Sequence, residues 1–453
     1  MKKILIVFYS LLLFNLFINA LFANKPVRIN QYKMDISVEG HCVNVVLDMS
    51  IDIKDKMPYL LFNQAFQINE LLIEDKPVKY YFSNDTLFFD AKQKKVVLHA
   101  EYTIISKLFI PSDTDYKLIP SSLNPFQILL ERYYKWYPLL YNNFANYDVR
   151  ITVPDSCFVF CFAPVDSIEF HNGKSIYYSH LFEEDFPVFI TTSSCYQKQT
   201  FQVFETTFNF YFLPSDKRFL KKIECPDTQF LFTDSVLLKD SLLGIIINRV
   251  LQSYEWYSKN LWKQEIKEIN IIEAAKGLGG FGLNSLILLN SDMIDYDLLR
   301  KNIISHEIAH LWIGLNTKYE SKGRFFMSES LNEYVNLLFY ESMFGEEALN
   351  DILMDYKFNR VYKNRPEYIT ISFSEVLKSR KQDSNIAEYI IYSKAPLFIH
   401  KFRQLIGKDK FLGIIKDTYN TTNQFITLKN FEKNIKKHHC WKAYKMLYKL
   451  EKQ

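Results

Sequence analysis

The pattern of apolar residues changes once along this chain, near residue 200, and this change constrains the fold more than any other feature. Before it, apolar and polar residues alternate in short runs such as 43–51 and 95–102, which is typical of β-strands. After it, apolar residues recur at helical spacing, as in 240–260 and 388–405. The sequence therefore predicts a β domain followed by an α-rich domain.

Further runs of the same two kinds complete the predicted order of elements. The expected strands cover 36–38, 43–51, 80–82, 86–89, 95–102 and 147–153, and later 208–212 and 269–272. The expected helices cover 240–260, 296–313, 328–344, 388–405 and 429–448. Because 453 residues exceed what one ordinary core holds, we assign residues 24–200 to a β-sandwich or saddle-like sheet domain and residues 201–453 to a second domain.

The first residues of the chain have the pattern of a secretory signal peptide. Two lysines precede an almost uninterrupted apolar run at 4–17, and Ala20 and Ala23 offer cleavage sites. We therefore predict that residues 1–23 direct export, to the periplasm or out of the cell. In the alternative, residues 4–23 stay uncleaved and anchor the protein in a membrane.

Composition excludes several classes of protein. Hydrophobic residues make up 48% of the chain and charged residues 23%, a balance that favours globular domains over disorder or a coiled coil. The net charge of +4 is small for this length, so we predict no nucleic-acid partner. Six cysteines permit disulfides in an exported chain but are too few to form the framework of such a fold, and their pairing is left open.

The string His306-Glu307-Ile308-Ala309-His310 is an HExxH motif inside a predicted helix. Positions i and i+4 of a helix lie on one face, so both imidazoles can reach the same tetrahedral metal ion. Glu307 then stands beside the position that the protein leaves open. The motif predicts zinc ligands at His306 and His310 and a general base at Glu307.

Two further acids follow at spacings that suit the same site. Eighteen residues separate His310 from Glu329, which lies near the start of the predicted helix 328–344 and supplies a third ligand of a His₂Glu catalytic site. Glu333 comes four residues later, on the same helical face. There its carboxylate can accept the other ring N–H of a ligating histidine and fix its tautomer.

This set of ligands implies hydrolytic chemistry. Three protein ligands leave a fourth position for water, and zinc lowers the pKa of such a water toward about 7. Glu307 can then take the proton as the water attacks a carbonyl carbon. We therefore predict one Zn²⁺ per chain, peptide-bond hydrolysis, and a peptide or protein as the substrate.

In this segment the sequence resembles the gluzincin aminopeptidases, the family of membrane alanyl aminopeptidase and leukotriene hydrolase. The family pattern of HExxH, a nearby Trp and Gly, and an NEGFAEY-like helix is matched at 306–310, 312–314 and 328–334. Downstream, Tyr392-Ser393-Lys394-Ala395 is similar to the family's Tyr-Glu-Lys-Gly. The resemblance implies that Tyr392 donates a hydrogen bond to the oxyanion of the intermediate, with Tyr389 as the alternative donor.

The resemblance also carries expectations for the fold and the substrate site. It implies a saddle-like β domain followed by a thermolysin-like catalytic domain. The family's GAMEN-like substrate strand corresponds here to Gly280-Phe281-Gly282-Leu283-Asn284, and we expect Gly279, Gly280, Phe281 and Gly282 to line the substrate. Leu283 replaces the glutamate that binds the free amino terminus in the family. Glu273 and Glu131 are candidate substitutes, although each reads more naturally as a surface carboxylate.

Length is the second departure from the family. The chain ends about 60 residues after Tyr392, so the family's large C-terminal helical domain is not expected and the cleft should be more open. The sequence thus predicts an aminopeptidase-like zinc peptidase and leaves two alternatives open. One is an endopeptidase with an open cleft, and the other is a catalytically weak, zinc-bearing binding or assembly protein.

Overall fold

The computed structural model of the protein separates into two compact units, residues 1–196 and 197–453, which are described one at a time. The structure describes residues 26–39, 42–105, 122–124, 127–130, 135–140, 143–161, 165–184, 190–214, 241–274, 281–283, 285–290, 303–314, 318–319, 323–357, 389–420 and 425–450. The predicted signal peptide at 1–23 and the candidate residues Glu131, Gly279 and Gly280 lie outside these ranges.

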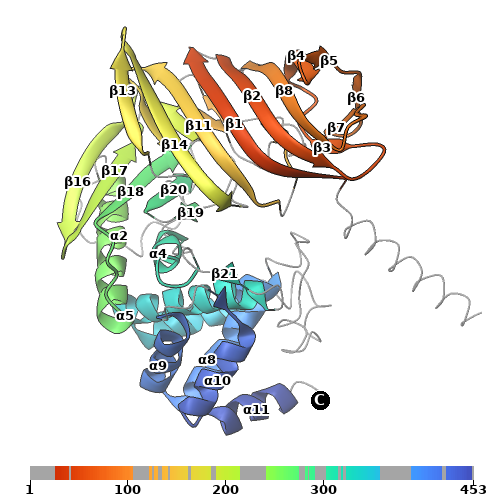
Figure 1. Cartoon of the computed structure of the whole chain (residues 1–453). Helices are drawn as coiled ribbons and strands as arrows, with labels where there is room; N and C mark the ends of the chain where they lie inside the picture. The colour runs from red at the N-terminus through yellow and green to blue at the C-terminus, as the bar shows by residue number, and fades with distance from the viewer. Residues whose placement is uncertain are drawn as a thin grey trace, which may run out of the picture. The chain divides into compact units, whose positions relative to one another are not determined.

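The first unit is built from β-strands (Figure 1). Its largest sheet, as described, has eight strands in the order β13-β14-β11-β1-β2-β8-β4-β5, and two smaller sheets have the orders β12-β15-β10-β9 and β3-β7-β6. The strands are β1 (Val27–Glu39), β2 (Cys42–Ile53), β3 (Tyr59–Leu61), β4 (Gln67–Ile73), β5 (Lys76–Pro77), β6 (Tyr80–Phe82), β7 (Thr86–Phe89), β8 (Lys95–Ile105), β9 (Ser122–Asn124), β10 (Gln127–Leu130), β11 (Ala145–Pro154), β12 (Phe158–Cys161), β13 (Ser167–His171), β14 (Lys174–Glu184) and β15 (Ile190–Ser193).

Alternating burial gives the eight-stranded sheet one apolar face and one polar face. Every second residue of β11 is buried, and the same alternation runs along β1 and β2. On the apolar face the rings of Tyr32 and Tyr147 are stacked with centroids 4.7 Å apart, and the Tyr32 hydroxyl donates to the Pro138 carbonyl at 3.1 Å. The period of two in the sequence therefore decides which side chains enter the core.

The second unit begins with a five-stranded sheet in the order β16-β17-β18-β20-β19. Its strands are β16 (Gln197–Val203), β17 (Thr206–Phe212), β18 (Glu268–Ala274), β19 (Phe281–Leu283) and β20 (Leu286–Asn290). The described helices that follow or intervene are α2 (Ser241–Asn260), α4 (Ile303–Ala309), α5 (Leu331–Asp355), α8 (Ala395–Ile406), α9 (Lys408–Tyr419), α10 (Leu428–Lys437) and α11 (Trp441–Leu450), with a short strand pair β21 (Lys318–Tyr319) and β22 (Phe425–Ile426).

This arrangement confirms the predicted fold class, a β-rich domain followed by an α-rich domain. Several predicted helix limits were wrong. The helix expected at 328–344 continues to Asp355 and bends at Gly345, where φ is 91°. The helix expected at 429–448 is two helices, α10 and α11, because the chain turns between them and His439 takes a φ of 59°.

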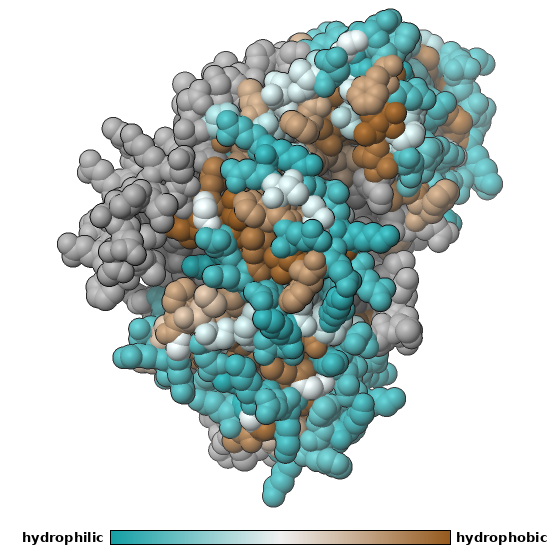
Figure 2. All heavy atoms as spheres, turned by 90° about the vertical axis from the view of Figure 1, so that its left-hand side faces the viewer, coloured by the Kyte–Doolittle hydropathy of each residue, from teal (hydrophilic) through white to brown (hydrophobic). Residues whose placement is uncertain are grey.

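The helices of the second unit are amphipathic. Apolar side chains of α2, α4, α5, α8, α9 and α10 form one buried cluster with β17, β18 and β20, while on the face shown in Figure 2 hydrophilic side chains predominate over the helical part. Within the described ranges, none of the helices combines the length and apolar character that crossing a bilayer requires.

Close packing between α9 and α10 gives a test of this core. A β-carbon on Gly413 would lie 2.8 Å from Cε1 of His438, whose Nε2 is 2.9 Å from the Asp417 carboxylate and is held there. We expect Gly413→Ala to destabilise the second unit by about 1–3 kcal/mol, since the ring must move and lose this contact. Urea unfolding followed by circular dichroism measures the change.

Gly244→Ala is the matched control, because this glycine of α2 has nothing within 4 Å of its β-carbon position. Alanine favours a helix over glycine, so the control should be neutral or up to about 1 kcal/mol more stable. Equal effects of the two substitutions would show that the His438 contact is unimportant.

Candidate metal centre

The HExxH residues lie where α4 ends. His306 and Glu307 belong to α4, and His310 follows it directly, with its backbone N–H donating to the His306 carbonyl at 3.2 Å. This bond keeps the i to i+4 relation of a helix, so the two imidazoles face the same side. Their ring centroids are 4.8 Å apart.

Glu329 comes from a π-helical turn, Phe326–Ser330, which leads into α5. A second π-helical turn, Ile390–Lys394, carries Tyr392 and leads into α8. Tyr392 donates from its hydroxyl to Oε2 of Glu329 at 2.8 Å. The two π-helical turns thus bring a carboxylate and a phenol together although 63 residues separate them in the sequence.

The distances between the three candidate ligands suit zinc. Oε2 of Glu329 lies 3.6 Å from Nε2 of His306 and 3.4 Å from Nε2 of His310. Nitrogen and oxygen ligands about 2.0–2.1 Å from a tetrahedral ion are about 3.4 Å from one another, so these atoms are already spaced for one. His306, His310 and Glu329 form one of two groups of potential metal ligands within the described residues.

The other nitrogen of each imidazole is occupied. Nδ1 of His306 is 2.7 Å from Oε2 of Glu333, and Nδ1 of His310 is 2.8 Å from the carbonyl oxygen of Ile313. An Nδ1–H that donates to oxygen leaves Nε2 without its proton and free to bind a metal. The second oxygen of Glu333 accepts from the Tyr356 hydroxyl, which holds the orienting carboxylate in turn.

Gly314 explains the Trp312-Ile313-Gly314 element that the sequence shares with the gluzincins. Its φ is +136°, and a β-carbon there would lie only 2.7 Å from Nδ1 of His310. Only glycine fits so close to this ring in that backbone conformation. Trp312 is buried and donates from its indole to the Trp262 carbonyl at 2.6 Å, which fixes the turn.

Three carboxylates surround the two histidines: Glu307 and Glu333 are buried, and Glu329 is partly buried. Burial alone would raise the pKa of Glu329, but His310 and His306 overcome this effect and hold that pKa well below its ordinary value. Burial would likewise lower the pKa of His306, yet the bonds to Glu329 and Glu333 raise it to about 10. The three carboxylates carry more negative charge than the two histidines can balance without binding protons. A divalent cation bound between them would balance the same negative charge.

Of the remaining two candidates, Glu307 is buried and Tyr392 is partly buried. Burial raises the pKa of Glu307, although His310 and His306 draw it down. Burial, together with the negative charge of Glu329, raises the pKa of Tyr392, so its hydroxyl keeps the proton at neutral pH and acts as a donor. Tyr389, the alternative donor, is partly buried just before the same π-helical turn.

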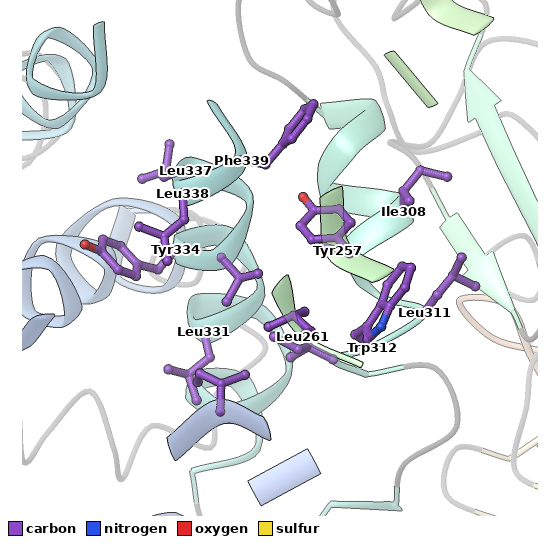
Figure 3. Close-up of a cluster of buried hydrophobic side chains, with 14 of the residues drawn as sticks. Tyr257, Leu261, Ile308, Leu311, Trp312, Leu331, Tyr334, Leu337, Leu338 and Phe339 are labelled. Carbon is purple, nitrogen blue, oxygen red and sulfur yellow. The ribbon is translucent and has the colours of Figure 1, made fainter. Parts of the chain in front are cut away.

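An apolar cluster holds the α4 segment against α5 (Figure 3). The Tyr257 ring lies 5.4 Å from the Trp312 ring and 5.9 Å from the Phe339 ring, measured between centroids. The Tyr257 hydroxyl also donates to the carbonyl of Ser305, next to the first histidine, at 3.0 Å. Rigid packing of this kind keeps ligands from separate helices at a fixed spacing.

The candidates for substrate binding are only partly described. Phe281, Gly282 and Leu283 form β19, the edge strand of the five-stranded sheet, paired antiparallel with β20. Glu273 was expected at the surface, and this was wrong. It is completely buried on β18, and its carboxylate accepts from the backbone N–H of Leu213 at 2.9 Å.

Comparison with known proteins agrees with this geometry. Residues 281–451 match the domain of peptidase family M1. This segment is therefore similar to the M1 peptidase domain. The resemblance to the gluzincin aminopeptidases that the motifs predicted is thereby confirmed. No curated protein matches the sequence.

Solved peptidase structures share the fold over most of the chain. An M1 zinc metallopeptidase from Deinococcus radiodurans is 12% identical, with a TM-score of 0.56 and 94% of each chain covered. A mutant of that protein bound to a Tyr-Ser-Ala substrate gives a TM-score of 0.53 at 13% identity, with 93% of each chain covered. Legionella pneumophila aminopeptidase A, in complex with aspartic acid, gives a TM-score of 0.63 at 13% identity, covering 92% of this chain and 48% of that one.

Sequence reasoning missed two residues that support the candidate metal centre. The Ile313 carbonyl, which holds His310, carries no signal in the sequence because any residue has a carbonyl. Tyr356, which holds Glu333, is one of 30 tyrosines and lies 23 residues further along the chain, directly after α5. Gly314, by contrast, does carry a signal in the sequence, because it belongs to the matched Trp312-Ile313-Gly314 element.

Gly314→Ala tests the close approach at His310. The new methyl group must displace the imidazole, so we expect the variant to lose most of its zinc on dialysis while the rest of the second unit stays folded. Metal content by mass spectrometry and the melting temperature are measured on the same sample.

Gly345→Ala is the control for backbone strain. Gly345 also has a positive φ, of 91°, but nothing lies within 4 Å of its β-carbon position. This variant should be less stable and still hold zinc. Retention of zinc by Gly314→Ala would contradict the steric role of the glycine.

Proposed function

We propose that this protein is a zinc-dependent peptidase of the aminopeptidase type. The observation that carries the proposal is the convergence of two Nε2 atoms and one carboxylate oxygen at the spacing of a tetrahedral ion, with both Nδ1 atoms held by oxygen. In this proposal His306, His310 and Glu329 hold the ion, and Glu333 orients the first histidine. When bound there, zinc supplies a Lewis acid and lowers the pKa of water toward about 7.

Glu307 is proposed as the general base. It follows His306 directly in α4, is buried, and its carboxylate can only accept protons or hydrogen bonds when ionised. A base in this position takes the proton of the attacking water and passes it to the leaving amine. A protein that used zinc only for structure would not need this carboxylate, which argues against a pure binding or assembly protein.

Tyr392 is proposed as the donor to the oxyanion of the tetrahedral intermediate. Its hydroxyl already lies 2.8 Å from the candidate ligand oxygen of Glu329, within reach of whatever binds beside that ligand. Because burial keeps the phenol protonated, it can donate to a negative oxygen without giving up its proton. Support for Tyr392 over Tyr389 rests on this contact.

The substrate proposed for the site is a peptide that lies along the edge strand β19. An unpaired strand edge offers backbone groups to which an extended peptide can bond. Leu283 stands in this strand where the family has its amine-binding glutamate. This replacement favours a second candidate activity, cleavage within a peptide chain.

We further propose that residues 1–23 place the activity outside the cytoplasm, on the evidence of their apolar run.

Glu307→Gln separates catalysis from metal binding. The amide has nearly the same shape but cannot take a proton, so we expect unchanged zinc content and a kcat lower by about 10²–10⁴-fold. Zinc analysis and peptide hydrolysis are measured on one preparation, with the exposed Glu347→Gln as control. Full turnover in Glu307→Gln would remove Glu307 as the base.

Tyr392→Phe tests the oxyanion donor. Loss of a donor that acts only in the transition state should lower kcat by about 10²-fold and leave KM nearly unchanged. Tyr389→Phe, three residues away, should behave like the unaltered protein. A loss confined to KM, or a larger loss in Tyr389→Phe, would contradict the assignment.

Matched peptides with free and acetylated amino termini distinguish the two modes of cleavage. Release of single residues from the free peptides alone would establish an aminopeptidase that binds the amine without a glutamate at position 283. Internal cleavage of both peptides would establish an endopeptidase. Bound zinc without cleavage of either would support the binding-protein alternative.

A further inference from the structure

A second group of potential metal ligands lies in the first unit, on the polar face of the eight-stranded sheet. Glu70 comes from β4, and His99 and Glu101 come from β8. Their ligand atoms lie within 4.8 Å of one another, the same criterion that the candidate metal centre meets. The three side chains are partly or fully exposed, so an ion from solution can reach them.

The imidazole of His99 is oriented as a metal ligand would be. Its Nδ1 lies 2.6 Å from Oδ1 of Asp48 on β2, the residue directly opposite on the neighbouring strand. Its Nε2 therefore points away from Asp48, and it lies 3.5 Å from Oε1 of Glu101. This is the arrangement found at His306, where Glu333 holds Nδ1 and leaves Nε2 for the metal.

The sheet places two carboxylates side by side at the same point. Glu70 and Glu101 are directly paired across β4 and β8, and like charges in that position repel each other. The pairing depends on a β-bulge between Ile68 and Glu70, which shifts the register of β4. Bulges redirect side chains, and this one brings Glu70 to the carboxylate of Glu101.

We propose that Glu70, His99 and Glu101 form a second zinc site, the rim site, with Asp48 as its orienting residue. One imidazole with two carboxylates suits zinc and related transition ions, whereas Ca²⁺ and Mg²⁺ prefer sites of oxygen only. A cation there neutralises the paired acids and links β4 to β8 near the edge of the sheet. The rim site is independent of the proposed peptidase activity and adds a second zinc to the one expected per chain.

Zinc stoichiometry of the full protein tests the proposal. After removal of metal with a chelator, equilibrium dialysis against micromolar free Zn²⁺ should give two ions per unaltered chain and one per His99→Ala chain. The double variant His306→Ala/His310→Ala should also bind one, at the rim site. Because the double variant lacks the candidate metal centre, a failure of the proposed function and a failure of the rim site are distinguishable.

Conservative variants guard against loss of folding. Glu70 is exposed, so Glu70→Gln should fold and yet lose zinc from the rim site in the double-variant background. Asp48→Asn should weaken that binding by about 10–100-fold, as expected for a residue that orients a ligand. His180→Ala is the matched control, because His180 also contacts aspartates, Asp166 at 2.7 Å and Asp148 at 3.7 Å, without two glutamates beside it.

The proposal predicts that zinc raises the melting temperature of the double variant and that His99→Ala abolishes the rise. It is overturned if the double variant binds no zinc, if His99→Ala binds as many ions as the unaltered chain, or if binding to the double variant needs millimolar zinc. A loss of zinc from His180→Ala equal to that from His99→Ala would overturn it as well.

Discussion

The contact of the partly buried Glu329 carboxylate with two imidazoles is the interaction on which the candidate metal centre depends. A buried charge is costly unless it is paired and hydrogen-bonded, so every group around Glu329 has to be in place at once. His306 and His310 supply the opposite charge, and the Tyr392 hydroxyl donates the remaining bond. Three separate segments therefore meet at one carboxylate, and their apolar packing has to hold them to within fractions of an ångström.

The apolar core supplies that accuracy. Tyr257 and Trp312 pack between α4 and α5, and the hydroxyl of Tyr257 bonds to the backbone beside the first histidine. The glycine after Trp312 then lets the chain turn back against the ring of His310. Tyr257 and Trp312 each make both apolar contacts and a hydrogen bond, so the metal ligands cannot move independently of the core. This coupling is what a reaction that needs fixed geometry requires.

The same physical device occurs in both units. A carboxylate binds Nδ1 of a histidine, and Nε2 faces a group of acids, at His306 in the second unit and at His99 in the first. In the second unit the arrangement is buried among helices. In the first it lies on a polar sheet face, where water screens the charges and the exchange of a bound ion is easier. In our proposal the β domain therefore binds a metal ion of its own, at the rim site.

The sequence by itself determined the class of fold, the family and the segment that carries the site. Periods of two and 3.6 residues separate strands from helices, and the HExxH motif with Glu329 and Glu333 needs only helical geometry to be interpreted. Only the tertiary structure decided which groups hold the ligands. The Ile313 carbonyl, Tyr356 and the π-helical turns of Glu329 and Tyr392 depend on contacts across 23 to 63 residues or on backbone conformation. Glu273 shows the same limit, because a lone glutamate on a strand reads as a surface residue until the sheet and its neighbours enclose it.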